Sequence, residues 1–588
     1  MPRRSNYDKF PFVSAGSAKE CTTGWEAIAA RLKECRMLCI ECYPGVFVRQ
    51  VVKELCAHLD LFAVFLSEEC LKTPEELHAM LDPVLGTDRV FGRMNGINIA
   101  DYFDASRVEA MRLAIEHSAK QGAVMVIGAG AGLVAPPDAT LVYADMARWE
   151  IQLRWRRGEL GNLGLDNAQE DAAVKYKCGF FVEWRAADRV KKILLPRVDF
   201  LLDTNQPQSP RLISGSTFRA SLASIARRPF RVVPYFDPGP WGGHWMEEVC
   251  DLPRDVPNHA WCFDCVPEEN SLLLGYGEHR VEVPAIDLVF LHPRELLGEA
   301  VHARFGTEFP IRFDFLDTMG GGNLSLQVHP LTEYIQDVFG MNYTQDESYY
   351  VLDAGEGAAV YLGLKENVAA EEMLADLRRA QEGGFEFPAE KYINRWPAKK
   401  HDHFLIPAGT IHCSGAESMV LEISATPYIF TFKLWDWGRT GLDGRPRPIH
   451  IDHGAANMQW DRTTSWVKRE LINRCELLVD VVGRKEERTG LHEREFIETR
   501  RHWFTGAAPH HTRGGVNVIN LVEGDEAVVE SPSNAFEPMV IHYAETFIVP
   551  ASVGAYTIRP CGLSEGKQCA TIKAYVRTGV KDDTPRTR

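Results

Sequence analysis

The stretch Leu324-Ser-Leu-Gln-Val-His-Pro330 alternates apolar and polar residues, and this period of two is typical of a half-buried β-strand. A strand projects residues two positions apart from one face, so Gln327 and His329 are predicted to lie side by side. Glu347 stands at the start of another β-type run, and His412 follows a Pro/Gly turn. Two imidazoles, a carboxylate and an amide oxygen form a shell that suits Zn²⁺, with Mn²⁺, Fe²⁺ or Co²⁺ as alternatives. The competing interpretation is a polar pair on an exposed strand face, with His412 at a turn.

Short β-type runs surround this stretch from residue 229 to the C-terminus, and Gly, Pro, Asp and Asn separate them. Short strands with dense turn signals are typical of a sandwich or barrel. A helical pattern at Ala369–Gln381 interrupts the first set of runs, and a second set follows toward the C-terminus. We therefore predict two β domains, over residues 229–465 and 466–580, and a disordered tail after Lys581.

The region before residue 229 has a different sequence pattern, in which strand-like apolar runs alternate with helical patterns. This alternation predicts a parallel sheet with helices on its faces, in an α/β domain over residues 1–228. The predicted strands include Met37–Ile40, Ala123–Ile127 and Thr140–Tyr143, and the predicted helices include Val46–Leu59 and Arg107–Gln121.

Four motifs follow one another in the second part of the chain. They are Pro240-Trp-Gly-Gly243, the stretch from Leu324 to Pro330, Ile406-Pro-Ala-Gly-Thr-Ile-His412, and Thr431-Phe-Lys-Leu-Trp-Asp-Trp-Gly-Arg439 with Gly444-Arg-Pro-Arg-Pro-Ile-His450. In order and approximate spacing, residues 234–576 resemble a class I mannose-6-phosphate isomerase, a cupin enzyme. The resemblance implies a tandem cupin fold, with zinc bound by Gln327, His329, Glu347 and His412.

The same resemblance implies an activity. The family interconverts mannose 6-phosphate and fructose 6-phosphate through an enediol intermediate, a reaction that a metal ion assists by stabilising negative charge on the sugar oxygens. Lys433 or Arg439 would hold the enediol or the phosphate. A small-molecule sugar phosphate is thus the predicted partner.

Three positions depart from the family pattern. Lys433 replaces an arginine, Gln345 stands where a lysine is common, and Gly322-Asn323 replaces a basic residue. These changes fall on the substrate shell and leave the metal ligands intact. Two alternatives to the isomerase therefore stay open: a cupin enzyme that acts on another sugar or polyol derivative, and a non-catalytic regulatory protein that binds sugar phosphates.

Two loops of the N-terminal region lie where a phosphate-binding loop would. Cys39–Gly45 lacks the GxxxxGK[ST] pattern, and Gly128-Ala-Gly-Ala-Gly132 lacks the last glycine of GxGxxG and precedes Pro136-Pro137, which oppose a helix. The segment Leu141–Asp145 and the arginines that follow it faintly resemble part of a nucleoside-kinase-type P-loop fold. We therefore predict that this domain is a degenerate relative without a functional P-loop. Its arginines either bind a phosphorylated ligand or form a solvated helix face with ion pairs; they are Arg148, Arg154, Arg156 and Arg157.

Composition narrows the class of protein. The net charge of −16 argues against non-specific binding to nucleic acid or to an anionic membrane. No apolar h-region follows Met1, and the apolar runs are too short to span a bilayer. The 14 cysteines form no pair of CxxC motifs, which favours reduced thiols in a cytoplasmic protein.

Other histidines are weaker candidates. His401 and His403 alternate just before a predicted strand, where an exposed pair at a turn is the favoured interpretation. His510 and His511 lack a Gln-x-His partner, so no second metal site is predicted.

Overall fold

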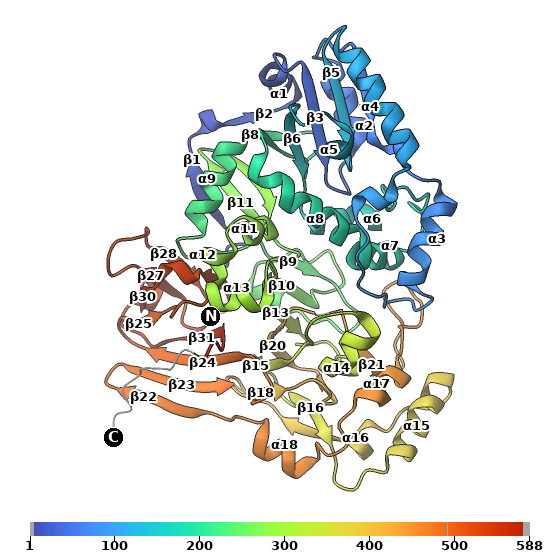
Figure 1. The fold of residues 1–588 in the computed structure, drawn as a ribbon. Coiled ribbons are helices and arrows are strands. Elements are labelled where there is room, and N and C mark those ends of the chain that lie inside the picture. The colour runs from blue at the N-terminus through green and yellow to red at the C-terminus, as the bar shows by residue number, and fades with distance from the viewer. Residues whose placement is uncertain (1–4, 428, 491, 580–588) are drawn as a thin grey trace.

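The computed structural model describes residues 5–427, 429–490 and 492–579. Residues 1–4, 428, 491 and 580 of the predicted domains, and the predicted tail after Lys581, lie outside these ranges. Figure 1 shows an α/β region at the top of the molecule, above a β-rich region that contains the middle and the C-terminal part of the chain.

The α/β region is built on a seven-stranded sheet in the order β2-β8-β7-β6-β3-β5-β4. Five neighbouring strands are parallel, as predicted: β3 (Met37–Cys42), β4 (Ala63–Leu66), β5 (Val124–Gly128), β6 (Thr140–Asp145) and β7 (Phe200–Asp203). Two antiparallel strands extend its edge: β8 (Arg211–Ser214) and β2 (Cys21–Thr23). The predicted helices are α2 (Val48–Cys56) and α4 (Ala105–Ala119). No helix within the described ranges is long and apolar enough to cross a bilayer.

The first β region is a sandwich of two antiparallel sheets, and the helix predicted at Ala369–Gln381 is present among its connections as α15 (Ala370–Glu382). The larger sheet consists, in order, of β18 (His403–Ile406), β15 (Glu347–Ala354), β20 (Ser418–Ala425), β13 (Ile311–Asp317), β10 (Trp261–Cys265) and β9 (Tyr235–Asp237). The smaller sheet consists of β17 (Ile393–Pro397), β16 (Ala359–Leu364), β19 (His412–Ser414), β14 (Leu326–Val328) and β21 (Phe432–Trp435).

The second β region repeats this architecture. Its larger sheet consists, in order, of β22 (Glu476–Val481), β23 (Arg484–Gly490), β24 (Ile497–Phe504), β31 (Cys569–Val576), β26 (Asn517–Glu523) and β29 (Thr546–Val549). The smaller sheet consists of β25 (Ala508–His511), β30 (Ala555–Pro560), β27 (Glu526–Glu530) and β28 (Met539–His542). Two sandwiches in tandem are the arrangement expected of a tandem cupin.

The start of the chain runs from the sandwiches, where Asn6 bonds to Asp525, toward the α/β region, where β2 joins the seven-stranded sheet. Strand β1 (Phe12–Gly16) pairs in parallel with β11 (Ser271–Tyr276), which also pairs with β12 (His279–Pro284). One apolar cluster runs through the α/β region and the first sandwich and reaches into the second. The boundaries 1–228, 229–465 and 466–580 therefore stay a proposal about sequence units, since packing is continuous across the first of them.

An aromatic side chain of the α/β region is inserted into the first sandwich. Phe91 is 3% exposed, and its ring centroid lies 5.3 Å from that of Phe432 and 4.6 Å from that of His450. It stacks on Phe430 with a centroid distance of 6.0 Å. The two regions therefore share an aromatic core, whose burial stabilises their contact.

Phe91→Leu is expected to lower the free energy of unfolding by about 1–2 kcal/mol, because leucine fills most of the space but loses the aromatic contacts. Urea unfolding followed by circular dichroism measures this change. Phe62→Leu is the control, since Phe62 is 52% exposed. Equal midpoints for the two variants would show that Phe91 contributes nothing special to the junction.

Candidate metal centre

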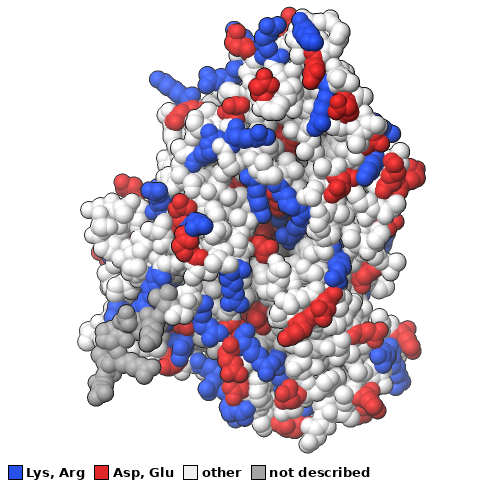
Figure 2. Space-filling view, in the orientation of Figure 1, with Lys and Arg blue, Asp and Glu red and all other residues white. Residues whose placement is uncertain are grey.

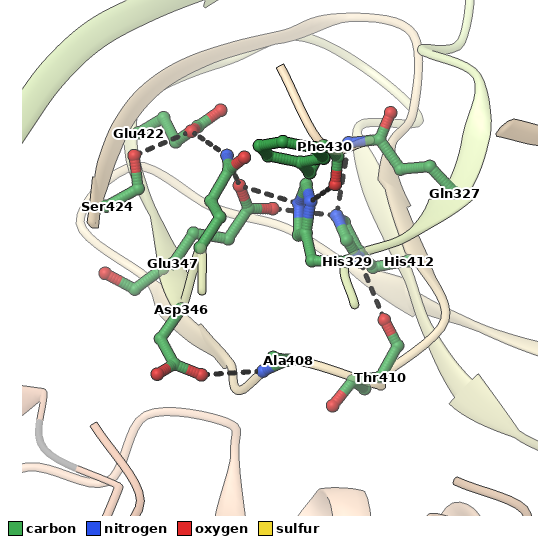
Figure 3. A network of polar contacts seen from close by, with 12 residues as sticks. Gln327, His329, Asp346, Glu347, Ala408, Thr410, His412, Glu422, Ser424 and Phe430 are labelled. Carbon is green, nitrogen blue, oxygen red and sulfur yellow. Dashed lines mark hydrogen bonds and ion pairs between the residues drawn. The ribbon is translucent and has the colours of Figure 1, made fainter. Parts of the chain in front are cut away.

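Four polar side chains converge inside the first sandwich (Figure 3). Gln327 on β14 and His412 on β19 are register partners, so their side chains project from the same face. His329 follows β14 directly, and Glu347 opens β15 in the facing sheet. His412 Nε2 lies 2.7 Å from Glu347 Oε1, and His329 Nε2 lies 3.1 Å from Glu347 Oε2. The predicted ligands are thus brought together, all of them buried.

Hydrogen bonds to the backbone orient both imidazoles. His329 Nδ1 lies 3.2 Å from the carbonyl oxygen of Phe430, and His412 Nδ1 lies 2.8 Å from that of Thr410. A carbonyl only accepts, so each Nδ1 carries a proton, and in a neutral imidazole Nε2 then presents its lone pair. Outer contacts of this kind fix the tautomer of metal-binding histidines.

The amide of Gln327 completes the group. Its Oε1 accepts a hydrogen bond from Ser325 Oγ at 3.1 Å, and its Nε2 lies 3.2 Å from His412 Nε2. Rotation of the amide by 180° exchanges its oxygen and nitrogen, which would place Oε1 beside His412 Nε2. An amide oxygen is then available as a fourth donor atom.

The donor set fits a divalent cation. Single ligand atoms of His329, Glu347 and His412 lie within 4.8 Å of one another, and this is the one group of three such residues within the described ranges. The Nε2 atoms and the carboxylate oxygens all present lone pairs to the same point. Acceptors that face each other in a buried place repel unless a cation lies among them.

A second layer of polar residues supports Glu347. Gln345 Nε2 donates to Glu347 Oε2 at 3.0 Å and to Glu422 Oε1 at 3.2 Å. Arg312 forms a buried ion pair with Glu422. Burial raises the pKa of Glu347, but positive charge on protonated His329 and His412 outweighs it and holds that pKa well below its usual range. A cation bound in place of their two Nε2 protons would have the same effect. Glu347 is therefore an ionised carboxylate in a fixed position.

The two predicted substrate contacts, Lys433 and Arg439, differ in their surroundings. Lys433 on β21 is a register partner of Gln327, so it projects from the same face. Burial lowers the pKa of Lys433 to about 8; Arg447 adds to this effect and Asp436 opposes it. Arg439 Nη2 pairs with Asp436 at 2.6 Å, and Arg447 Nη1 pairs with the same carboxylate at 2.8 Å. Of the two cations, Arg439 is thus the one that already forms an ion pair with a carboxylate of the chain.

Arg439 also lies beside a position that departs from the family pattern. A Cβ built on Gly322 would stand 3.2 Å from Arg439 Nη1. The guanidinium therefore occupies space near the segment in which a basic residue is missing from the sequence. Arg439 thus places a positive charge beside Gly322, although Gly322 and Asn323 themselves carry none.

The glycine loop of the α/β region holds one of the chain's own carboxylates. Gly130 N–H donates to Glu41 Oε1 and Gly132 N–H donates to Glu41 Oε2, both at 2.7 Å. Burial raises the pKa of Glu41 to about 7, although the two N–H groups oppose the rise. The carboxylate of Glu41 therefore occupies the position in which this loop would bind a phosphate. The helix after the loop, α5 (Ala131–Val134), ends before Pro136, as the two prolines predict.

The four arginines of this region all pair with carboxylates, which favours the ion-pair interpretation. Arg148 and Arg154 are buried, so the expectation of a solvated face is wrong for these two. The pairs are Arg148 with Asp188 at 2.6 Å, Arg154 with Glu150 at 3.0 Å, Arg156 with Asp237 at 2.7 Å, and Arg157 with Glu150 at 3.0 Å.

Two histidines near the sandwich junction differ from each other. His401 lies 2.9 Å from Tyr350 Oη and 3.2 Å from Glu523 Oε2. His403 is fully buried, so the expectation of an exposed pair is wrong for it. β18 lies inside the structure because β23 packs against it, and no local pattern in the sequence reveals this contact.

Sequence reasoning also missed residues that hold the site in place. Arg462 donates to the carbonyl oxygens of Pro407 and Ala408 at 2.7 and 2.8 Å, and so fixes the turn before His412. Asp346 Oδ1 accepts the N–H of Ala408 at 2.8 Å. The position of Asp346, directly beside Glu347, is the one local signal that could have marked it.

Comparison with known proteins gives separate results for the two parts of the chain. Residues 24–227 match a family model described as "Domain of unknown function (DUF8485)". Over 214 residues the chain is 28% identical to the mannose-6-phosphate isomerase of Streptococcus mutans serotype c, a match that covers 36% of this chain but only 62% of that protein. Over 349 residues it is 21% identical to the mannose-6-phosphate isomerase ManA of Bacillus subtilis (strain 168), covering 58% of this chain and 96% of that protein.

Among solved structures, the mannose 6-phosphate isomerase from Bacillus subtilis is similar, with 18% sequence identity and a TM-score of 0.49 over 59% of this chain and all of that one. The resemblance of the N-terminal part to a nucleoside kinase stays a prediction. The predicted similarity to mannose-6-phosphate isomerases is confirmed for part of the chain, at identities below 30%.

Proposed function

We propose that this chain is a metal-dependent aldose–ketose isomerase that interconverts mannose 6-phosphate and fructose 6-phosphate or a closely related sugar phosphate. The observation that carries the proposal is the buried convergence of His329, Glu347 and His412. Their flanking sequence resembles the isomerase family, and relatives with that name match part of the chain.

The residues of the site have distinct tasks in this proposal. Gln327, His329, Glu347 and His412 would hold a divalent cation, for which Zn²⁺ suits the mixed nitrogen and oxygen donors. When bound, such a cation polarises sugar oxygens and stabilises the negative charge of an enediolate. Lys433 would bind anionic oxygens of the substrate from β21, and Arg439 would contribute a second cation.

Direct assay tests the proposal. Purified protein is analysed for metal and then incubated with mannose 6-phosphate or fructose 6-phosphate. We expect interconversion with one divalent metal per chain. A chain that binds one metal but converts neither sugar phosphate would contradict the isomerase.

A related substrate is the second candidate, and the substrate shell favours it. Gln345 is neutral and bonds to two carboxylates, so it offers no charge to a phosphate. Lys433 gives a point charge where the family has the planar fork of an arginine. Activity on another phosphorylated sugar, with none on mannose 6-phosphate, would support this candidate.

Lys433→Ala is expected to raise the KM for the sugar phosphate by about 10- to 100-fold, the equivalent of one hydrogen bond to a charged group. Metal content should not change, because Lys433 is not one of the proposed metal ligands. Steady-state kinetics and metal analysis measure both quantities. Lys433→Arg is the matched control and should recover most of the affinity; an unchanged KM in Lys433→Ala would remove this residue from the site.

A further inference from the structure

The second sandwich contains a cavity of about 590 Å³ that both of its sheets line. β23, β24 and β31 contribute from the larger sheet, and β25 contributes from the smaller one. Ligand sites for small molecules commonly have volumes of about 300–1,000 Å³. The cavity is therefore large enough for a small metabolite.

The wall of this cavity is positively charged, although the chain carries a net charge of −16. Figure 2 shows Lys and Arg side chains gathered at the lower left of the molecule, in the region that Figure 1 labels β22 to β24. Among the residues that the structure describes, two carboxylates line the cavity, Glu486 and Glu498. The lining cations are Arg484, Arg488, Arg500, Arg513, Lys573 and Arg577.

One arginine pairs with both carboxylates. Arg500 Nε lies 2.7 Å from Glu498 Oε1, and Arg500 Nη1 lies 3.0 Å from Glu486 Oε1. His502 Nε2 lies a further 3.4 Å from Glu486 Oε1. The two carboxylates of the wall are thus paired with Arg500 and His502. They do not neutralise the remaining positive charge of the wall.

Two buried groups of the wall have no such partner. His510 is 7% exposed, and within the described ranges neither of its ring nitrogens makes a hydrogen bond. Its ring stacks on Tyr556, with centroids 5.1 Å apart, so its orientation is fixed. Lys573 is also 7% exposed, and its ammonium group forms no ion pair with any residue that the structure describes.

A buried ammonium group among other cations is unfavourable unless an anion compensates it. Burial lowers the pKa of Lys573 to about 8; Glu486 opposes the shift, whereas Arg500 and Arg513 add to it. The same positive field repels a metal cation. A phosphate group, with several acceptor oxygens and more than one charge, matches the mixture of ammonium, guanidinium and imidazole donors.

The geometry points to a second ligand site in this cavity, one that binds the phosphate group of a phosphorylated small molecule of about the size of a sugar phosphate. Lys573, His510 and Arg484 are its main donors. It lies in the second sandwich, whereas the metal cluster lies in the first. The site is therefore independent of the proposed isomerase activity.

Isothermal titration calorimetry on the full, metal-loaded chain tests this site with fructose 6-phosphate, inorganic phosphate and fructose. We expect the wild type to bind fructose 6-phosphate in the cavity more tightly than inorganic phosphate, and to bind no fructose there. Lys573→Met should weaken this binding about 10- to 100-fold, the loss of one charged hydrogen bond. Metal content should stay the same, since no metal ligand is changed.

Two further variants complete the test. Arg484→Gln removes a partly exposed cation of the wall and keeps the test valid if Lys573→Met does not fold. Lys485→Gln removes the same charge from the next residue of β23, which does not line the cavity. Binding in Lys573→Met or Arg484→Gln that equals binding in Lys485→Gln would overturn the proposal. So would fructose 6-phosphate binding no tighter than inorganic phosphate.

Discussion

His329→Ala is expected to abolish both the proposed metal binding and the proposed isomerase activity, with a fall in kcat/KM of about 10³-fold or more. Its Nε2 is one of the lone-pair atoms that face Glu347 at the centre of the cluster. Without it, the remaining imidazole and carboxylate hold a cation less tightly, and charge on the sugar oxygens is no longer stabilised. Metal analysis after gel filtration and a coupled assay measure the two losses.

Chelation and a matched variant separate this effect from misfolding. Treatment of the wild type with a chelator should reproduce the loss of activity, and added Zn²⁺ should restore it only in the wild type. His58→Ala is the control, because His58 is exposed. If His329→Ala kept its full metal content, the ligand assignment would be wrong.

Lys191→Ala is expected to destabilise the fold by about 3–5 kcal/mol, since it leaves two buried carboxylates without their cation. Lys191 Nζ lies 2.8 Å from Asp145 Oδ2 and 2.6 Å from Asp287 Oδ1, and all three side chains are fully buried. Asp145 ends β6 of the α/β region, whereas Asp287 belongs to α11 (Ile286–Leu291), next to β12. The ion triad therefore joins two parts of the chain.

Urea unfolding followed by circular dichroism measures the change in the midpoint. Lys53→Ala is the control, because Lys53 is an exposed lysine on α2 of the same region. The triple variant Lys191→Met, Asp145→Asn, Asp287→Asn should recover much of the loss, since no net buried charge remains. A midpoint for Lys191→Ala equal to that of Lys53→Ala would contradict the role of the triad.

The sequence predicted local features of the fold well. Strong periodic runs, such as those that form β3, β5 and α4, were located to within about two residues, because hydrophobic period and turn residues act locally. The four proposed metal ligands were found through motifs that stand next to strands and turns. Each ligand was identified from residues that lie only a few positions from it in the sequence.

Long-range contacts could not be predicted in this way. Gln345 bonds to Glu422, which lies 77 positions along the chain, and His403 is buried by a strand of the other sandwich. Glu41 fills a glycine loop that comes 89 positions later. Such contacts form only when particular strands become neighbours. Local patterns in a single sequence do not predict which distant strands will pair.

The pairing of β1 with β11 has a practical consequence for dissecting the molecule. A fragment that starts after residue 228 would lack β1, and β11 would become an open edge with unpaired N–H and C=O groups along Ser271–Tyr276. Exposed edges of this kind recruit strands from other molecules. Expression of the two sandwiches alone is therefore expected to give aggregates, unless the fragment retains residues 5–16 or receives a replacement strand.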